Sequence, residues 1–249
     1  MLQAVLFDLD GTLVDTGQLI RVSCDRTFRE VLGIAAPAAE LTAAVGTPLV
    51  EQFERVARGV VCDNDWERPT QALYGRDRLT PLNGAQRAAV DELRDRLITH
   101  YTALNDAIHD EYIRAFDGIP KLLETLQSAG KLLGVVTSKR RYAATQDLAH
   151  FGLDAYFPVI VCADDLPWHK PDPRPVLHAI ELLRQPDPPD AADCAYIGDS
   201  PFDMLAGLGA GCMTIGVSWG MFPADQLRAC RPDLMVDTPA ELADALSAL

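Results

Sequence analysis

The sequence predicts an α/β protein in which a doubly wound, Rossmann-like parallel sheet carries an inserted α-helical cap domain. Three observations lead to this fold class. Five short apolar runs have the near-continuous hydrophobicity of strands that are buried on both faces. Amphipathic helical patterns separate most of these runs, and such alternation is typical of parallel sheets. Between about residue 16 and residue 115 the chain shows helical patterns and no buried strand.

The expected core elements alternate along the chain. We expect five strands, at residues 3–8, 132–137, 157–162, 194–198 and 212–217. We expect core helices at residues 119–130, 140–151, 173–185, 202–210 and 239–248. The last helix has a clear start, because Thr238 is a suitable N-cap and Pro239 suits the first turn.

The segment after the first strand is expected to form the separate helical domain. Its helical patterns cover residues 17–33, 48–59 and 85–115. The polar segment 60–82 predicts an irregular loop. We therefore place the core domain at residues 1–15 and 116–249, and the cap domain at residues 16–115. The linkers between them are expected near Val14–Gln18 and Ala115–Ile119.

Composition limits the partners and the compartment that we expect. The 249-residue chain has a formal net charge of −14. That charge argues against a nucleic-acid partner, because phosphate backbones are bound by clustered Lys and Arg. No uncharged run approaches the ~20 residues that span a bilayer, and Asp8 and Asp10 interrupt the apolar start, so we expect neither a leader peptide nor a membrane span. Six cysteines spread singly favour a reducing, cytoplasmic compartment.

Polar side chains follow four of the expected strands at their carboxyl ends, where open parallel sheets bind ligands. These segments are Asp8-Leu9-Asp10-Gly11-Thr12, Thr137-Ser138-Lys139, Trp168-His169-Lys170-Pro171 and Gly198-Asp199-Ser200-Pro201-Phe202-Asp203. Folding would bring their acids, hydroxyl groups and lysines to one edge of the sheet. This set suits phosphoryl transfer, which requires a metal and cations to neutralise the phosphate and a nucleophile held in line.

The acids can be given roles from their chemistry. Magnesium prefers oxygen ligands, so Asp8 and Asp199 are candidate metal ligands and Asp203 is a candidate for holding a metal-bound water. An aspartate can attack phosphorus and form an acyl phosphate, which makes Asp8 the candidate nucleophile. Asp10 would then protonate the leaving alkoxide and later deprotonate the water that hydrolyses the intermediate.

Lys170 and Thr137 are the candidates for contacting the phosphoryl group. Lys170 would screen charge between the nucleophile and the phosphate, and Thr137 would donate a hydrogen bond to a phosphoryl oxygen. Two neighbours have open interpretations. Ser138 either binds substrate or caps the next helix, and Lys139 either takes part in the site or faces solvent. We expect His169 to be a structural neighbour of Lys170.

Four segments resemble the four sequence motifs of the haloacid dehalogenase-like (HAD) hydrolase superfamily, in the same order. They read FDLDGTLVDT, VVTSK, HKPDPRP and IGDSPFDMLAGLGAG. The position of the helical segment is similar to that of the family's helical cap. The resemblance implies that Asp8 is the nucleophile and that Asp10 is the general acid/base, with its backbone carbonyl also binding magnesium. It further implies phosphoryl and metal contacts from Thr137, Lys170, Asp199 and Asp203.

Within this superfamily the chain most resembles the phosphoglycolate phosphatases. An Asp at the second acidic position points to phosphatases and phosphomutases rather than dehalogenases. The inserted region has no lysine to form the Schiff base of phosphonoacetaldehyde hydrolases. The similarity to phosphoglycolate phosphatases implies 2-phosphoglycolate as the leading substrate and Thr47 as a substrate contact. It rests on the segments VGTPL (45–49), VVTSK, KPDPRP and GVSWG (216–220).

Other functions stay open on the sequence alone. A pyrophosphatase subgroup shares the GVSW segment. A phosphomutase of the β-phosphoglucomutase kind would share the aspartyl phosphate and differ only in the group that accepts the phosphoryl. A non-catalytic phosphate-binding protein is disfavoured by the intact set of acids and Lys170. In the enzymatic cases we expect a small phosphorylated metabolite as the partner, Mg²⁺ as the cofactor, and a monomer or homodimer.

Overall fold

The computed structural model describes residues 2–36, 46, 48–63, 81–183 and 187–247. It divides into two compact units. One unit is formed by Met1–Gly17 together with Ile113–Leu249, and the other by Gln18–Tyr112. Both boundaries fall a few residues from those expected from the sequence.

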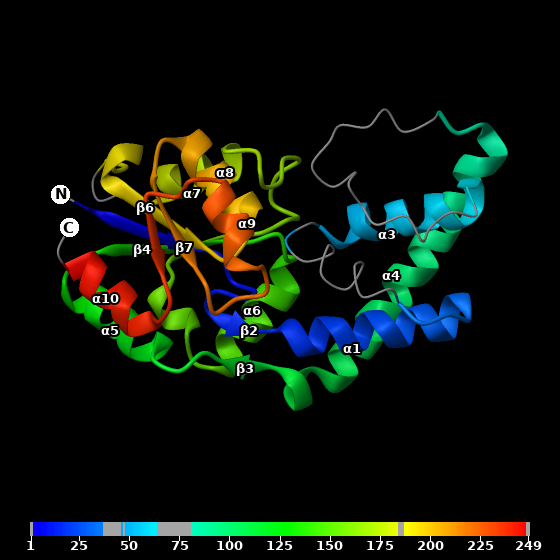
Figure 1. The fold of residues 1–249 in the computed structure, drawn as a ribbon, viewed down its shortest axis with the longest axis horizontal. Helices are drawn as coiled ribbons and strands as arrows, with labels where there is room; N and C mark the ends of the chain where they lie inside the picture. The colour runs from blue at the N-terminus through cyan, green and yellow to red at the C-terminus, as the bar shows by residue number, and fades with distance from the viewer. Residues whose placement is uncertain (1, 37–45, 47, 64–80, 184–186, 248–249) are drawn as a thin grey trace. The chain divides into compact units, whose positions relative to one another are not determined.

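The first unit is built on a six-stranded parallel sheet (Figure 1). Its strands are β1 (Ala4–Phe7), β4 (Leu132–Val136), β5 (Val159–Val161), β6 (Cys194–Gly198), β7 (Met213–Val217) and β8 (Leu234–Val236). Their spatial order is β5-β4-β1-β6-β7-β8. The chain runs outward from β1 to β5, then returns to β6 beside β1 and runs outward again. This topology confirms the predicted doubly wound fold, and its order reverses beside β1, where such sheets bind ligands.

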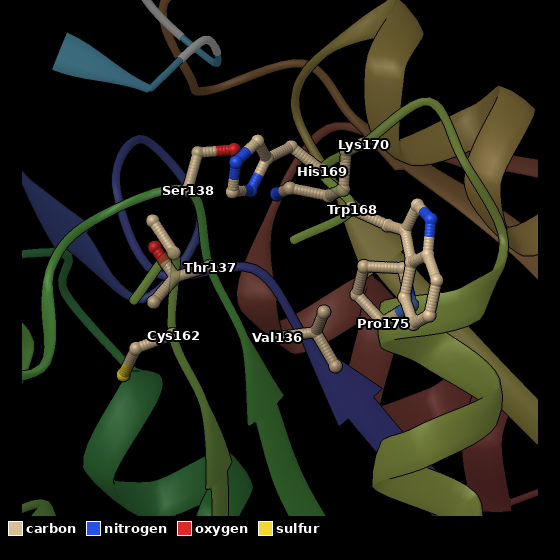
Figure 2. A pocket seen from close by; sticks show the side chains of 9 residues that line it. Val136, Thr137, Ser138, Cys162, Trp168, His169, Lys170 and Pro175 are labelled. Atoms are coloured by element: carbon tan, nitrogen blue, oxygen red, sulfur yellow. The ribbon is translucent and has the colours of Figure 1, made fainter. Parts of the chain in front are cut away.

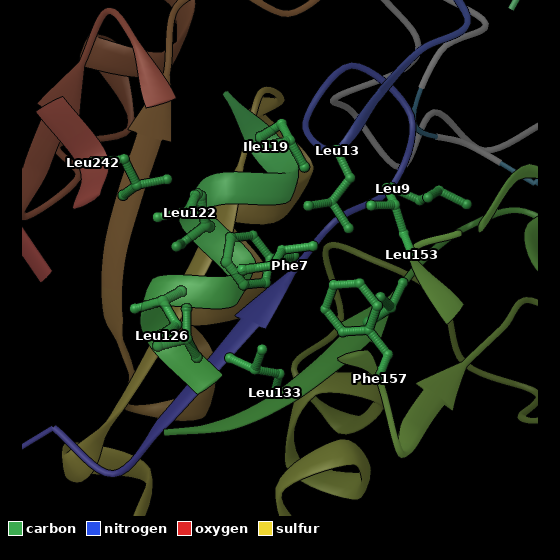
Figure 3. Close-up of a cluster of buried hydrophobic side chains, with 14 of the residues drawn as sticks. Phe7, Leu9, Leu13, Ile119, Leu122, Leu126, Leu133, Leu153, Phe157 and Leu242 are labelled. Carbon is green, nitrogen blue, oxygen red and sulfur yellow. The ribbon is translucent and has the colours of Figure 1, made fainter. Parts of the chain in front are cut away.

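Strand β1 is buried on both faces, because successive side chains of a strand point to opposite sides. Val5 and Phe7 join one apolar layer, and Ala4 and Leu6 join the other. The first layer, shown in Figure 3, includes side chains from α5 (Ile119–Ser128), α6 (Arg141–His150) and α10 (Pro239–Ser247). The second includes side chains from α7 (Arg174–Leu182) and α8 (Pro201–Ala210). The residue that follows β1 is therefore held by a rigid strand.

Some elements of the core were not predicted. Strand β8 is short and only half-buried, and α9 (Ala224–Ala229) is too short to show a helical period. Short 3₁₀ helices at Asp154–Tyr156 and Ala191–Asp193 also escaped the sequence pattern. The segments expected as linkers pair as a small antiparallel ladder, β2 (Val14–Asp15) with β3 (Arg114–Ala115).

The regular elements described in the second unit are all helical. They are α1 (Gly17–Thr27) with a π-helical turn at Phe28–Leu32, α3 (Leu49–Arg58) with a π-helical turn at Gly59–Asp63, and α4 (Gly84–Tyr112). Their apolar faces meet in a core that contains Cys24, Phe28, Phe53, Val56 and Leu97. In the parts of the chain that the structure describes, no helix has the length and apolar character required to cross a bilayer.

Candidate active site

Asp8 lies directly after the central strand β1, at the carboxyl edge of the sheet, and is only 5% exposed. Its backbone amide donates to the Ile197 carbonyl oxygen at 2.8 Å, which extends the pairing with β6. The chain then turns at Gly11, whose φ of +80° favours glycine. A Cβ on Gly11 would lie 2.3 Å from Asp199 Oδ2. The turn therefore also provides the space in which Asp199 approaches the Asp8 loop.

Lys170 is the cation beside Asp8. Its Nζ donates to Asp8 Oδ1 at 2.8 Å and to Asp203 Oδ1 at 2.6 Å, and its side chain is 2% exposed. Burial alone would lower the pKa of Lys170, but the negative charges of Asp203 and Asp8 raise it above its ordinary value. Lys170 is therefore a permanent positive charge fixed against the candidate nucleophile.

Asp203 holds Lys170 in place. It lies in the first turn of α8 and forms a capping box with Ser200. Its Oδ2 accepts from the Ser200 amide at 3.1 Å and from the Ser200 hydroxyl at 2.5 Å. Its Oδ1 accepts from Lys170 and from the Tyr196 hydroxyl, the latter at 3.0 Å. A carboxylate has about four acceptor positions, so Asp203 is largely committed to these partners.

Asp199 is arranged differently and has an unused acceptor. Its Oδ2 accepts from the Met221 amide at 2.6 Å. Its Oδ1 is buried and has no hydrogen-bond partner among the described residues. Burial, followed by the charges of Asp8 and Asp203, raises the pKa of Asp199 well above its ordinary value. A buried acceptor without a partner is costly to the fold, and a bound cation would supply the missing partner.

The acidic cluster fits a magnesium ion. Carboxylate oxygens of Asp8, Asp199 and Asp203 lie within 4.8 Å of one another. Burial and the nearby charge of Asp203 raise the pKa of Asp8 from 3.8 to about 7, a shift that a bound cation would oppose. The available donors are oxygens, which Mg²⁺ prefers. Because Asp203 is already occupied by other donors, Asp8 and Asp199 are the better direct ligands.

A small pocket adjoins this cluster at the end of β4 (Figure 2). Its lining includes Thr137, Ser138, His169 and Lys170. Thr137 Oγ1 accepts from the Lys139 amide at 3.1 Å, and a hydroxyl that accepts in this way can donate its own proton to a phosphoryl oxygen. The N-cap of α6 is Arg140, without a side-chain cap. Capping of that helix by Ser138, one of its two interpretations, is therefore wrong.

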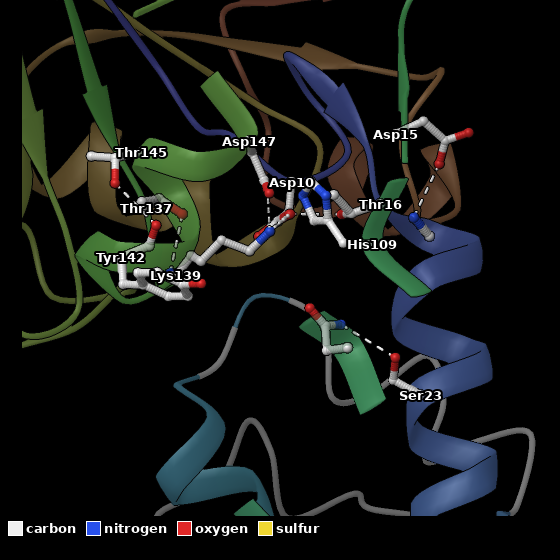
Figure 4. A network of polar contacts seen from close by, with 12 residues as sticks. Asp10, Asp15, Thr16, Ser23, His109, Thr137, Lys139, Tyr142, Thr145 and Asp147 are labelled. Carbon is white, nitrogen blue, oxygen red and sulfur yellow. Dashed lines mark hydrogen bonds and ion pairs between the residues drawn. The ribbon is translucent and has the colours of Figure 1, made fainter. Parts of the chain in front are cut away.

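Asp10 belongs to a second polar cluster (Figure 4). Its Oδ1 accepts from the Thr16 hydroxyl at 2.6 Å and from Lys139 Nζ at 2.8 Å. Lys139 Nζ also pairs with Asp147 on α6. The interpretation that Lys139 faces solvent is wrong, since its side chain is 15% exposed and bound to two carboxylates. Burial alone would lower the pKa of Lys139, but Asp10 and Asp147 raise it above its ordinary value.

The structure brings most of the expected site residues together within the first unit, and it adds others. Thr47 lies outside the described residues. Sequence reasoning missed Tyr196, Met221 and Asp147 as partners of the functional acids. The signal for Tyr196 was its hydroxyl in a fully buried strand, which requires a partner. The signal for Asp147 was a carboxylate that shares the buried side of α6 with Ala144 and Leu148.

Comparisons with known proteins give the family and the fold. Residues 5–217 match the family model for haloacid dehalogenase-like hydrolases. A Clostridium perfringens protein, provisionally named pyrophosphatase PpaX, is 32% identical over 100% of this chain and 99% of its own. Pyrophosphatase PpaX of Bacillus velezensis is 30% identical, with 96% and 94% covered. The crystal structure of a predicted phosphoglycolate phosphatase from Haemophilus somnus shares the fold, with a TM-score of 0.75, 21% identity and 98% of both chains covered.

Proposed function

Because this chain belongs to the haloacid dehalogenase-like hydrolase family, we propose that it is a Mg²⁺-dependent phosphatase that works through a phosphorylated Asp8. The observation that carries the proposal is the buried pair of Asp8 and Lys170, 2.8 Å apart, beside Asp199. Within the described residues Asp199 Oδ1 has no hydrogen-bond partner. A purely structural ion pair would not require a second buried acid with a missing partner.

In the first step, a carboxylate oxygen of Asp8 attacks phosphorus. The bond between Asp8 and phosphorus forms as the bond from phosphorus to the leaving oxygen breaks. Lys170 and the hydroxyl of Thr137 stabilise the negative charge on the phosphoryl oxygens. Asp10 gives its proton to the leaving oxygen, so that the product departs as a neutral alcohol.

In the second step, Asp10 takes a proton from water as the water oxygen attacks the phosphorus of the aspartyl phosphate. The bond to Asp8 breaks, inorganic phosphate leaves, and Asp8 and Asp10 return to their starting states. Asp8, Asp199 and the backbone carbonyl of Asp10 would hold the magnesium ion, with Asp203 beside them. When bound, the ion supplies positive charge to the phosphoryl oxygens.

The substrate is proposed to be a small phosphorylated metabolite, with 2-phosphoglycolate as the first candidate. Inorganic pyrophosphate is the second, because relatives that align along nearly the full chain carry pyrophosphatase names. The chemistry at Asp8 is the same for both compounds. The leaving groups differ, since a glycolate alkoxide requires protonation far more than a phosphate ion does.

The test is phosphate release from a panel that contains 2-phosphoglycolate, pyrophosphate, sugar phosphates and nucleotides, each with Mg²⁺ and with chelator. We expect strong release from at least one compound and its loss with chelator. Asp8→Asn should release no phosphate from that compound while remaining folded. Release that persists in Asp8→Asn or in chelator would contradict the proposal, and a rearranged sugar phosphate in place of free phosphate would identify a phosphomutase.

The roles of the second unit and of the assembly are also proposals. We propose that the helical unit Gln18–Tyr112, including Thr47, selects the substrate, since the residues assigned to phosphoryl chemistry lie in the other unit. Exchange of this unit for that of a relative should alter the order of substrates and preserve sensitivity to Asp8→Asn. We also propose a cytoplasmic monomer or homodimer. All six cysteines are free thiols, as a reducing compartment would maintain.

A further inference from the structure

The second polar cluster contains more buried charge than the proposed reaction uses. Asp10 is the proposed acid/base, but Lys139 and Asp147 have no step of their own. Asp147 is 1% exposed and lies on α6, a helix whose other buried residues are apolar or small. Removing a lysine and a carboxylate from water is costly to the fold before their attraction is counted. A structural purpose alone would be met as well by apolar side chains.

We propose that Lys139 is a positioning residue that holds the carboxyl group of Asp10 in its working orientation and that Asp147 anchors Lys139. The inference rests on the proposed function. Lys139 Nζ lies 2.8 Å from Asp10 Oδ1 and pairs at the same time with Asp147 (Figure 4). Its backbone is fixed as well, because its amide donates to Thr137 Oγ1 and its carbonyl accepts from the Ala163 amide.

The contacts distinguish the two oxygens of Asp10. Its Oδ1 accepts from both Thr16 and Lys139. Within the described residues no donor reaches its Oδ2. Two donors on one oxygen leave the other oxygen to carry the proton that is transferred. Lys139 and Thr16 therefore determine which edge of the carboxyl group serves the substrate.

The consequence falls on one part of the reaction. Asp10 Oδ2 gives its proton to the leaving oxygen as the bond from that oxygen to phosphorus breaks, and later takes a proton from water. Without Lys139, the carboxyl group of Asp10 can rotate, and fewer encounters have the proton directed at the leaving oxygen. Attack by Asp8 itself is unaffected. The loss should therefore grow with the basicity of the leaving group.

The experiment measures kcat/KM of Lys139→Met for two substrates. p-Nitrophenyl phosphate has a weakly basic leaving group that departs without a proton, and an alkyl phosphate such as glycerol 2-phosphate has a strongly basic one. The value of kcat/KM reports the steps up to departure of the leaving group, so hydrolysis of the aspartyl phosphate does not obscure the comparison. We expect a loss of roughly 10–100-fold for the alkyl phosphate and less than about threefold for the aryl phosphate.

The same strand offers a matched control. Lys131 immediately precedes β4 and donates to the Leu2 carbonyl at 2.6 Å, whereas Lys139 follows β4. Lys131→Met should leave both kcat/KM values unchanged. Asp147→Asn is a second test with nearly unchanged volume, which applies if Lys139→Met fails to fold. It should also lower kcat/KM more for the alkyl phosphate than for the aryl phosphate, but by a smaller factor than Lys139→Met. Lys139→Arg should restore part of the alkyl activity.

A double-mutant cycle with Asp10→Ala separates this inference from the proposed function. Asp10→Ala should itself favour the aryl substrate, and in that background Lys139→Met should add no further discrimination. Equal losses for both substrates in Lys139→Met, or discrimination that persists without Asp10, would overturn the positioning role while leaving the phosphatase intact. Absence of discrimination in Asp10→Ala would remove the acid/base role from the proposed function, and this inference with it.

Discussion

Two lysines of the core each bridge two aspartates, and the two bridges differ in their access to water. The nucleophile cluster consists of Asp8, Lys170 and Asp203. The acid/base cluster consists of Asp10, Lys139 and Asp147. In the nucleophile cluster every side chain is at most 6% exposed. In the acid/base cluster the anchor Asp147 is 1% exposed, but Asp10 is 18% exposed.

The difference fits the roles proposed for the two acids. A nucleophile reacts best when water is excluded and a fixed cation is close. A group that gives a proton to one oxygen and takes a proton from water needs contact with both. The same arrangement, a lysine held by a second buried aspartate, thus contacts one acid that is shielded from water and another that is partly exposed to it.

Replacement of the nucleophile tests this division most strongly. Asp8→Asn should lower phosphate release by on the order of 10³-fold or more, because no atom at this position can then form the phosphorylated intermediate. Thermal unfolding should show an intact fold, since Asn has the same size and relieves repulsion from Asp203. Asp225→Asn, at an exposed position on α9, is the matched control and should keep full activity. Comparable losses in both variants would mean that Asp8 is not the reacting group.

Replacement of the two anchors compares the clusters directly. Asp203→Asn should reduce the free energy of unfolding by about 3 kcal/mol, since the fully buried Asp203 carboxylate accepts from Tyr196 and Ser200 as well as from Lys170. It should also lower kcat/KM for aryl and alkyl phosphates alike. Asp147→Asn should cost less stability and affect mainly the alkyl phosphate. Urea unfolding and the two-substrate assay measure both effects. An identical pattern in the two variants would show that the clusters do not have separate roles.

The sequence predicted the nucleophile cluster better than the acid/base cluster. Asp8, Asp10, Lys170 and Asp199 follow strands whose buried patterns are clear, so their meeting at one sheet edge could be anticipated. The pairing of Lys139 with a carboxylate on the following helix could not, because it depends on how α6 turns back over the sheet. Strand β8 was missed for a similar reason: its three residues are too few to show a period.

Gly11, which follows Asp10 in the chain, allows a third comparison. Gly11 and Gly152 both have positive φ, +80° and +65°. An added Cβ costs roughly 1–2 kcal/mol of backbone strain at such a position. At Gly152 the methyl group meets nothing within 4 Å, whereas at Gly11 it lies 2.3 Å from Asp199 Oδ2. Gly11→Ala should therefore destabilise the protein by about 1–3 kcal/mol more than Gly152→Ala.

The two glycine variants should also differ in their magnesium requirement. Displacement of Asp199 in Gly11→Ala should raise the magnesium concentration that is required for half-maximal phosphate release. Gly152→Ala should leave that concentration unchanged. Magnesium titrations of the two variants would therefore measure whether the Gly11 turn serves the cation site, and equal requirements would show that it does not.

The smallest expected effect is a pH dependence confined to the nucleophile cluster. Burial and the charge of Asp203 raise the pKa of Asp8 from 3.8 to about 7, so between these values the native state binds more protons than the unfolded state. The contribution of Asp8 to stability in chelator therefore falls as the pH rises from about 4 to 7. The melting temperature of Asp8→Asn, relative to the unchanged protein, should rise across this range.

Asp172 supplies the control for this titration. Hydrogen bonds from Arg174 lower the pKa of Asp172 to about 2, so between pH 5 and pH 7.5 this group is ionised in both the folded and the unfolded state. The melting temperature of Asp172→Asn should therefore differ from that of the unchanged protein by a constant amount. Magnesium should stabilise the unchanged protein more at pH 7.5 than at pH 5, because the cation competes with the proton at Asp8. A flat Asp8→Asn difference would mean that Lys170 keeps Asp8 ionised throughout this range, and the nucleophile cluster would then need no metal to hold its charge.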